Sequence, residues 1–298
     1  MGKEYDMNKV NVSDLPGLFQ SADAASNEAQ WRYFFALKTY LIVLITASSF
    51  AYYPQTTSTI SIISASLFLI ALGITIWLNV KKPEKTWYDA RSLAESVKTR
   101  SWRWMMCSEP YDFNKNDIVV SKQFVSDLKQ ILEQNRYLGS EIGNMEGPQA
   151  PITMKMRSIR SMPFEKRLEI YEKHRIEDQA TFYSKGAISN RKKSSFWFWV
   201  MVSVQSLALL TLLLKIKDPQ TSLPVASLAV CASSALSWTQ AKKHKDLSAS
   251  YALAAHEIVL IKADAISVKS EKELVEFVID SENAFSREHT QWVARKRE

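Results

Sequence analysis

The chain has 298 residues, and its mean hydropathy of −0.17 resembles that of a soluble protein. In a soluble protein its net charge of +7 would favour nucleic-acid binding. This average conceals a segregated sequence: charge-free stretches alternate with strongly polar ones, and many Lys and Arg residues lie beside the charge-free stretches. Cations in that position meet anionic lipid headgroups, so we expect a membrane protein that does not bind nucleic acid directly.

Four apolar segments form two hairpins, and each hairpin has a short loop that contains proline. A helix needs about 20 residues to cross a hydrocarbon core of about 30 Å. The second and third segments supply that length without a charge. The first does so only if its helix begins near Tyr33, and the fourth is the shortest and contains four serines. For these two segments a buried helix of a soluble core is the alternative. The predicted spans are residues 33–53, 59–80, 196–214 and 222–238.

The distribution of basic residues predicts the orientation of the spans. The loop around Pro54 carries no charge, whereas Lys and Arg residues follow the second span, precede the third and follow the fourth. Because basic residues stay on the cytoplasmic side, we expect a multi-pass protein with both termini in the cytoplasm. The residues concerned are Lys81, Lys82, Lys85, Arg191, Lys192, Lys193, Lys242, Lys243 and Lys245.

The two hairpins belong to a tandem repeat. In each repeat a tryptophan near the end of the hairpin is followed, four and five residues later, by two lysines. These residues are Trp77, Lys81 and Lys82 in the first repeat and Trp238, Lys242 and Lys243 in the second. Glycines and prolines interrupt the chain between the repeats. We therefore predict two modules, at residues 1–140 and 163–298, with a linker at residues 141–162.

The polar parts of both modules predict helices that pack as a cytoplasmic bundle. Their apolar residues recur at spacings of three and four, as on one face of a helix. One such stripe consists of Leu253, Ile258, Ile261, Ile266, Leu274, Phe277 and Val278. The predicted helices cover residues 84–106, 121–137, 164–190, 247–266 and 272–297, and the third of them continues into the third span. The fold class is thus all-α: four transmembrane helices as two tandem hairpins, plus the bundle.

Further candidates on these helices combine aromatic and charged side chains. Arg91 and Glu95 are four residues apart, so we expect them to form an ion pair. Packing between helices is the favoured interpretation of the whole set, and contact with a ligand or coupling to the membrane is the alternative. The candidates are Trp87, Arg91, Glu95 and Arg103 in the first module and Tyr171, Arg175, Asp178, Gln179, Tyr183 and Lys185 in the second.

The predicted spans contain small and polar residues but no charge at mid-membrane, which disfavours an ion-coupled carrier. Ser227, Cys231 and Ala235 are spaced by four, which lets two helices approach closely. Gln205 lies at the middle of the third span, where its amide either joins helices or lines a polar path. The candidates for an interhelical seam or a pore are Gln205, Ser206, Ser227, Cys231, Ser234, Ser64 and Gly73.

The sequence contains no recognisable catalytic motif. His256-Glu257 lacks the second histidine four positions on that a zinc-peptidase helix requires, and no glycine-rich phosphate loop occurs. Cys107 lies in a charged segment and Cys231 in an apolar one, so a disulfide is not expected. We therefore expect a protein that is not an enzyme and that needs no cofactor or metal.

The run from Trp87 to Glu95, which continues through residues 102–106 to Glu109-Pro110-Tyr111, resembles the SLATT superfamily. These are two-span membrane effectors associated with SMODS nucleotidyltransferases and SLOG nucleotide sensors in bacterial conflict systems. Residues 171–190 are similar to the entry helix of another SLATT subtype. The resemblance covers about residues 14–137 and 163–298.

The resemblance implies an effector in the bacterial inner membrane that takes part in antiphage defence. Its partners would be the lipid bilayer, further copies of itself, and a nucleotide second messenger or an upstream sensor protein. When triggered, it would oligomerise and form a pore or disrupt the membrane, which arrests or kills the cell. The alternative is a membrane-anchored scaffold that recruits a sensor or an enzyme and conducts nothing.

Overall fold

The described residues form helices, with no strand among them, as the sequence predicts. A computed structural model describes residues 10–51, 57–143, 150–218 and 223–297, with side chains up to residue 286. The chain divides into two compact units. The bundle unit comprises residues 1–29, 84–185 and 250–298, and the hairpin unit comprises residues 30–83 and 186–249.

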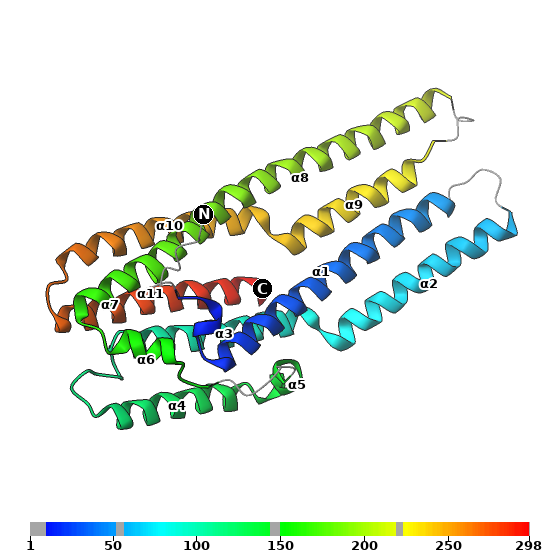
Figure 1. Ribbon diagram of the computed structural model, residues 1–298. Coiled ribbons are helices and arrows are strands. Elements are labelled where there is room, and N and C mark those ends of the chain that lie inside the picture. Colours follow the sequence, from blue (N-terminus) through cyan, green and yellow to red (C-terminus); the bar gives the residue numbers. More distant parts are fainter. Residues whose placement is uncertain (1–9, 52–56, 144–149, 219–222, 298) are drawn as a thin grey trace, which may run out of the picture. The chain divides into compact units, whose positions relative to one another are not determined.

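Two antiparallel helix pairs make up the hairpin unit (Figure 1). Helix α1 pairs with α2, and α8 pairs with α9; α1 and α8 also contribute residues to the bundle unit. The Trp238 ring of α9 contacts Phe34 of α1 and Trp197 of α8, with centroid distances of 6.0 and 6.2 Å. Helix α9 therefore lies between α1 and α8. The helices are α1 Gly17–Ala51, α2 Ser58–Lys81, α8 Glu177–Lys217 and α9 Val225–Lys242.

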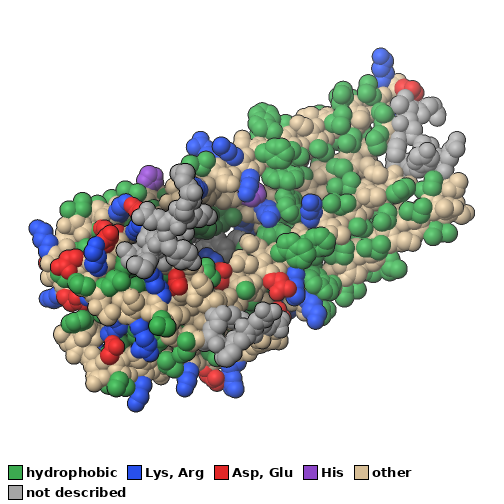
Figure 2. All heavy atoms as spheres, in the orientation of Figure 1, with side chains coloured by type: hydrophobic (Ala, Val, Ile, Leu, Met, Phe, Trp, Pro, Cys, Tyr) green, Lys and Arg blue, Asp and Glu red, His purple; other side chains and the backbone are tan. Residues whose placement is uncertain are grey.

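Three of the four predicted spans fall on helical stretches that are long and apolar enough to cross a membrane. The fourth predicted span falls on α9, which is not among them. Helix α9 has 18 residues, and several of these are Ser, Thr, Gln or Lys. Figure 2 shows hydrophobic side chains gathered over the hairpin helices and charged side chains over the helices of the bundle unit. The three stretches are Gly17–Ala51, Ser58–Met105 and Phe164–Lys217.

The tandem repeat recurs in the backbone at the end of each hairpin. Lys82 and Lys243, each five residues after the repeated tryptophan, have φ angles of 45° and 47°. Each donates its backbone N–H to a carbonyl four residues earlier and ends its helix in the left-handed conformation. Another helix then begins at once, α3 at Pro83 and α10 at His244. The two lysines thus mark the same turn in both modules.

The bundle unit contains helices from both modules, α3 and α4 from the first and α7, α10 and α11 from the second. A π-helical turn, η3 Glu172–Ile176, joins α7 to α8, so the predicted long helix into the third span is present with one irregular turn. The bounds of the helices are α3 Pro83–Met105, α4 Asp117–Gln134, α5 Gly139–Ile142, α6 Met154–Arg160, α7 Phe164–Tyr171, α10 His244–Asp264 and α11 Glu271–Arg297. Short 3-10 turns are η1 Val12–Asp14, η2 Arg136–Leu138 and η4 Ala265–Ser267.

One hydrophobic core fills the bundle unit. Its fully buried side chains include Trp102 and Phe124 from the first module and Tyr171, Leu274 and Val278 from the second. Met156 and Ile159 of α6, inside the predicted linker, are buried in the same core. Neither half of the chain therefore completes this core by itself.

Some sequence predictions for the bundle are wrong in detail. Leu253 and Ile266 were expected on the packing stripe, but their side chains are 57 and 82 % exposed, whereas Ile258 is buried. Helix α4 begins at Asp117 instead of Ser121, because the Asn116 side chain accepts the Ile118 N–H and caps the helix earlier.

Replacing Lys82 or Lys243 with glycine is expected to stabilise the protein. A non-glycine residue in the left-handed region costs about 1–2 kcal/mol, part of which is offset because glycine loses more backbone entropy on folding. The net gain is about 0.5–1 kcal/mol for each replacement, measured by thermal unfolding in detergent. Lys81→Gly, one residue earlier in helical conformation, is the control and should destabilise. If Lys82→Gly lowered the melting temperature as much as Lys81→Gly does, this explanation of the turn would be wrong.

Candidate functional site

A buried carboxylate joins the two modules inside the bundle unit. The side chain of Glu282 in α11 is 0 % exposed and pairs with that of Arg175, which is 1 % exposed. Arg175 donates Nε–H and Nη2–H to the two carboxylate oxygens at 2.8 and 2.7 Å. Tyr171 Oη donates at 3.0 Å, and Thr99 Oγ1 of α3 donates at 2.8 Å. Thr99 belongs to the first module and the other three residues to the second, so this carboxylate joins both.

The local helices bring these groups together. Tyr171 ends α7, and Arg175 lies in the π-helical turn that follows it; such turns are rare and often occur at functional sites. Glu282 lies on the buried face of α11, which also carries Phe277 and Val278. The Arg175 guanidinium stacks over the Phe285 ring at 4.9 Å. Helical spacing therefore directs the acid and its donors into the core.

The protonation of neighbouring groups reflects this burial. Burial raises the pKa of Tyr171 well above its usual value, and the negative charge of Glu282 adds to the effect, so the phenol remains a hydrogen-bond donor. Burial lowers the pKa of Lys98; the charge of Glu95 opposes this change and that of Arg175 adds to it.

More charged side chains lie nearby on α3 and α1. Arg91 donates from Nη2 to Glu95 Oε1 at 2.7 Å, which confirms the predicted pair, and from Nη1 to Asp23 Oδ1 of α1 at 3.1 Å. Ser26 Oγ of α1 donates to the Trp87 carbonyl at 3.2 Å. The bundle part of α1 is thus fastened to α3. We call the six charged residues the charge cluster: Asp23, Arg91, Glu95, Lys98, Arg175 and Glu282. Three are acidic and three basic.

Two more buried arginines hold the C-terminal end of α3. Arg160 donates from Nη1 to the Trp104 carbonyl at 2.6 Å and from Nη2 to the Tyr111 carbonyl at 3.0 Å. Arg167 donates to the Met106 carbonyl at 2.7 Å. Carbonyls at a helix C-terminus lack partners within the helix and carry partial negative charge, so these guanidinium groups stabilise the end of α3. Arg160 also pairs with Asp117, and Arg167 pairs with Glu271.

The geometry of the charge cluster favours packing over ligand contact for Arg175. Its side chain is sealed from solvent and committed to Glu282, so it contacts no soluble ligand in this conformation. Arg103 donates to Asn283 Oδ1 at 2.8 Å. Of the other candidates, Asp178 and Lys185 are exposed, and Gln179 and Tyr183 are half-buried. No group of three metal-ligating side chains occurs among the residues that the structure describes.

Two of the seam candidates in the hairpin unit bind neighbouring helices. Ser64 Oγ of α2 donates to the Ala47 carbonyl of α1 at 3.1 Å. Ser227 Oγ of α9 donates to the Ser48 carbonyl of α1 at 3.2 Å. Ser234 is buried as well, on the same helix as Ser227. Hydroxyl groups that bond to a carbonyl across a helix pair draw the two backbones together.

Cys231 is a half-buried free thiol on α9, four residues after Ser227. Gln205 and Ser206 are exposed on α8. Gly73 lines an apolar groove of about 480 Å³ with Trp31, Trp77 and other residues of α1 and α2.

Sequence reasoning missed Glu282, Thr99, Arg160 and Arg167. One signal was available for Glu282, because it follows Val278 by four residues on an otherwise apolar face of its helix. Nothing comparable marks the two arginines, which bond to backbone carbonyls as well as to one carboxylate each.

Comparison with protein families gives two matches that together cover most of the chain. The family model described as SMODS and SLOG-associating 2TM effector domain 3 matches residues 16–168. The model described as SMODS and SLOG-associating 2TM effector domain 1 matches residues 171–292. No curated protein and no solved structure matches the chain. The charge cluster takes residues from both matched regions.

Removing either partner of the Arg175–Glu282 pair is expected to destabilise the protein strongly. Arg175→Met or Glu282→Leu alone leaves the other charge buried and unpaired, which costs about 3–5 kcal/mol. The double variant removes both charges and should recover most of that loss, because well-packed apolar residues replace buried ion pairs at little cost. Unfolding of all four proteins in detergent gives the double-mutant cycle. Additive losses would contradict a direct pair.

Proposed function

Because this chain belongs to the SLATT family of two-transmembrane effectors, as two tandem domains of different subtypes, we propose that it is a pore-forming effector of a bacterial antiphage system. It acts in the inner membrane with four spans and both termini in the cytoplasm. Copies assemble through the hairpin unit, and a sensor protein or nucleotide signal acting on the bundle unit opens the pore. The result is abortive infection, in which the cell stops growing or dies.

The apolar surface of the hairpin unit carries this proposal. Large hydrophobic side chains along α2 and α8, among them Leu69, Leu72, Trp199 and Leu209, are exposed. Contiguous apolar surface of this kind marks a membrane or protein interface. The length and composition of three helical stretches suit a membrane crossing, so lipid is the medium that fits this surface.

Helix α9 offers a different face. Its exposed positions recur at spacings of three and four and form one stripe, in which the side chains are small or polar except for Leu236. These positions are Ala226, Ala229, Ser233, Leu236, Ser237 and Gln240. In a lipid environment such a face is better placed toward water than toward acyl chains. We assign the conducting path to this stripe, which also explains why α9 is less apolar than the other spans. Without a charged ring, the path would select weakly between ions.

Gln205 supports assembly of several copies. It lies within the apolar part of α8 and is exposed, and its amide makes no hydrogen bond within the part of the chain that the structure describes. An amide inside a membrane is stabilised when it finds a hydrogen-bond partner on another helix. A second copy of this chain provides that partner without any further protein.

Coupling between the modules follows from their shared core. Because Glu282 joins Thr99 to Arg175, a signal that rearranges one module of the bundle unit alters the other as well. The covalent continuity of α1 and α8 then carries the change to both hairpins. One trigger would thereby act on four spans together.

Propidium uptake and membrane potential in bacteria test the function directly. Cells expressing this chain with its genomic neighbours should depolarise and take up the dye after phage infection, and cells without the chain should not. Intact membranes under conditions in which toxicity still depends on this chain would overturn the pore and support the alternative of a non-conducting scaffold.

Cysteine accessibility tests the assignment of the α9 stripe. In a background of Cys107→Ala and Cys231→Ala, a cationic thiol reagent should reduce the triggered leak at least several-fold for Ser233→Cys and Ser237→Cys. Leu209→Cys on the apolar face of α8 is the matched control and should be insensitive, because lipid covers it. The reverse pattern would remove α9 from the conducting path.

A further inference from the structure

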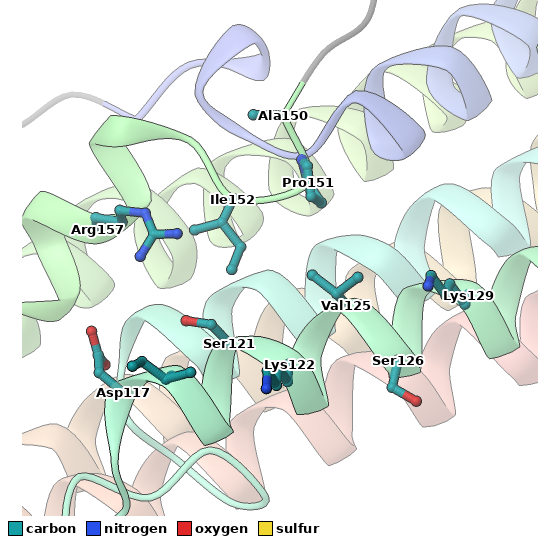
Figure 3. Close-up of a pocket in the computed structure, with 11 residues that line it drawn as sticks. Asp117, Ser121, Lys122, Val125, Ser126, Lys129, Ala150, Pro151, Ile152 and Arg157 are labelled. Atoms are coloured by element: carbon teal, nitrogen blue, oxygen red, sulfur yellow. The ribbon is translucent and has the colours of Figure 1, made fainter.

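A pocket of about 660 Å³ opens in the bundle unit, outside the charge cluster (Figure 3). Helix α4 forms one wall, and residues 150–152 together with Arg157 of α6 form the other. All lining residues lie within the region that matches the first effector domain, residues 16–168. The volume is in the range of small-molecule sites in proteins.

The charge of this pocket is positive and largely uncompensated. Lys122, Lys129 and Arg157 line it, and none of their side chains forms an ion pair within the part of the chain that the structure describes. Asp117 also lines the pocket, but its carboxylate already pairs with Arg160 Nε at 3.1 Å. Three free cations around one concave surface attract anions. A phosphate group would gain from each of them.

The pocket also contains an unused hydrogen-bonding group. The Ser121 hydroxyl is buried and has no partner among the described residues, although buried polar groups in folded proteins are nearly always hydrogen-bonded. Figure 3 places it on α4, across the pocket from the Arg157 side chain. A bound ligand that accepts from Ser121 would remove this unfavourable state.

Apart from Ser126, the rest of the lining is apolar. Ile118, Val125, Pro151 and Ile152 contribute aliphatic surface between the cations, and Ile152 and Val125 approach each other from opposite walls (Figure 3). Inorganic phosphate would leave this surface uncovered. A flat heterocycle attached to a phosphate would cover it, because apolar walls with a few polar groups are typical of small-molecule sites.

We propose that this pocket binds a phosphate-bearing ligand of nucleotide size, with Arg157 and Lys122 on the phosphate and Ser121 donating to it. The proposal rests on the proposed function in one respect: it names the chemistry of the signal and the place where it acts. Arg157 and Arg160 lie three residues apart around α6, and Arg160 holds the Trp104 carbonyl at the end of α3. An occupied pocket would therefore reposition α3, which carries Thr99, a hydrogen-bond partner of Glu282.

Calorimetric titration of the purified full-length protein in nanodiscs tests the site. The probes are pyrophosphate, AMP, ATP and a cyclic dinucleotide, each at low and high salt. We expect saturable binding of at least one nucleotide, tighter than that of pyrophosphate and weaker at high salt. Arg157→Ala and Lys122→Ala should each weaken it about tenfold or more, since each removes a charge-assisted contact. Ser121→Ala should weaken binding while raising the melting temperature of the unliganded protein.

Lys272→Ala is the matched control, because Lys272 is an exposed lysine of α11 outside the pocket; it should bind the probe as the wild type does. Melting temperatures verify that the variants fold. Absence of saturable binding up to about millimolar concentration, or equal binding by Arg157→Ala, overturns the proposal. Dye release from liposomes is measured separately. Binding without release would leave the site in place and refute the pore, whereas triggered release without binding would refute only the site.

Discussion

The bundle unit depends on one buried carboxylate. Glu282 receives hydrogen bonds from Arg175, Tyr171 and Thr99, and a charge in that position is tolerable only while its partners remain in place. Since Thr99 comes from the first module, the second module cannot satisfy its own acid completely. The requirement to pair this charge therefore ties the two modules together.

A buried ion pair adds little to the free energy of unfolding while it is intact. Removing one partner costs far more, because the other charge is then buried and unpaired. That property suits the proposed function, in which the pore stays closed until a signal acts on the bundle unit. The bundle unit joins both modules through the charge cluster, and the hairpin unit joins them through Ser227 of α9 and the Ser48 carbonyl of α1. Each unit therefore contains contacts that join the two tandem domains.

The sequence predicted the periodic features well and the non-periodic ones poorly. Helix positions, the Arg91–Glu95 pair and the recurring Trp–Lys spacing all follow from regular intervals along a helix. Leu253 and Ile266 were misplaced because a hydrophobic residue near a stripe need not face the core. The burial of Glu282 was not predicted, because it depends on a partner, Arg175, more than 100 residues away in the sequence. The pocket at Arg157 could not be predicted, since it forms only where α6 meets α4.

Expression of the chain as two separately tagged polypeptides, residues 1–146 and 147–298, tests the shared core most directly. We expect the halves to copurify from detergent when they are coexpressed, and each half to aggregate or be degraded when it is expressed alone. Glu282→Ala in the second half should abolish copurification. Two halves that are each folded and stable alone, with copurification indifferent to Glu282, would contradict a shared core.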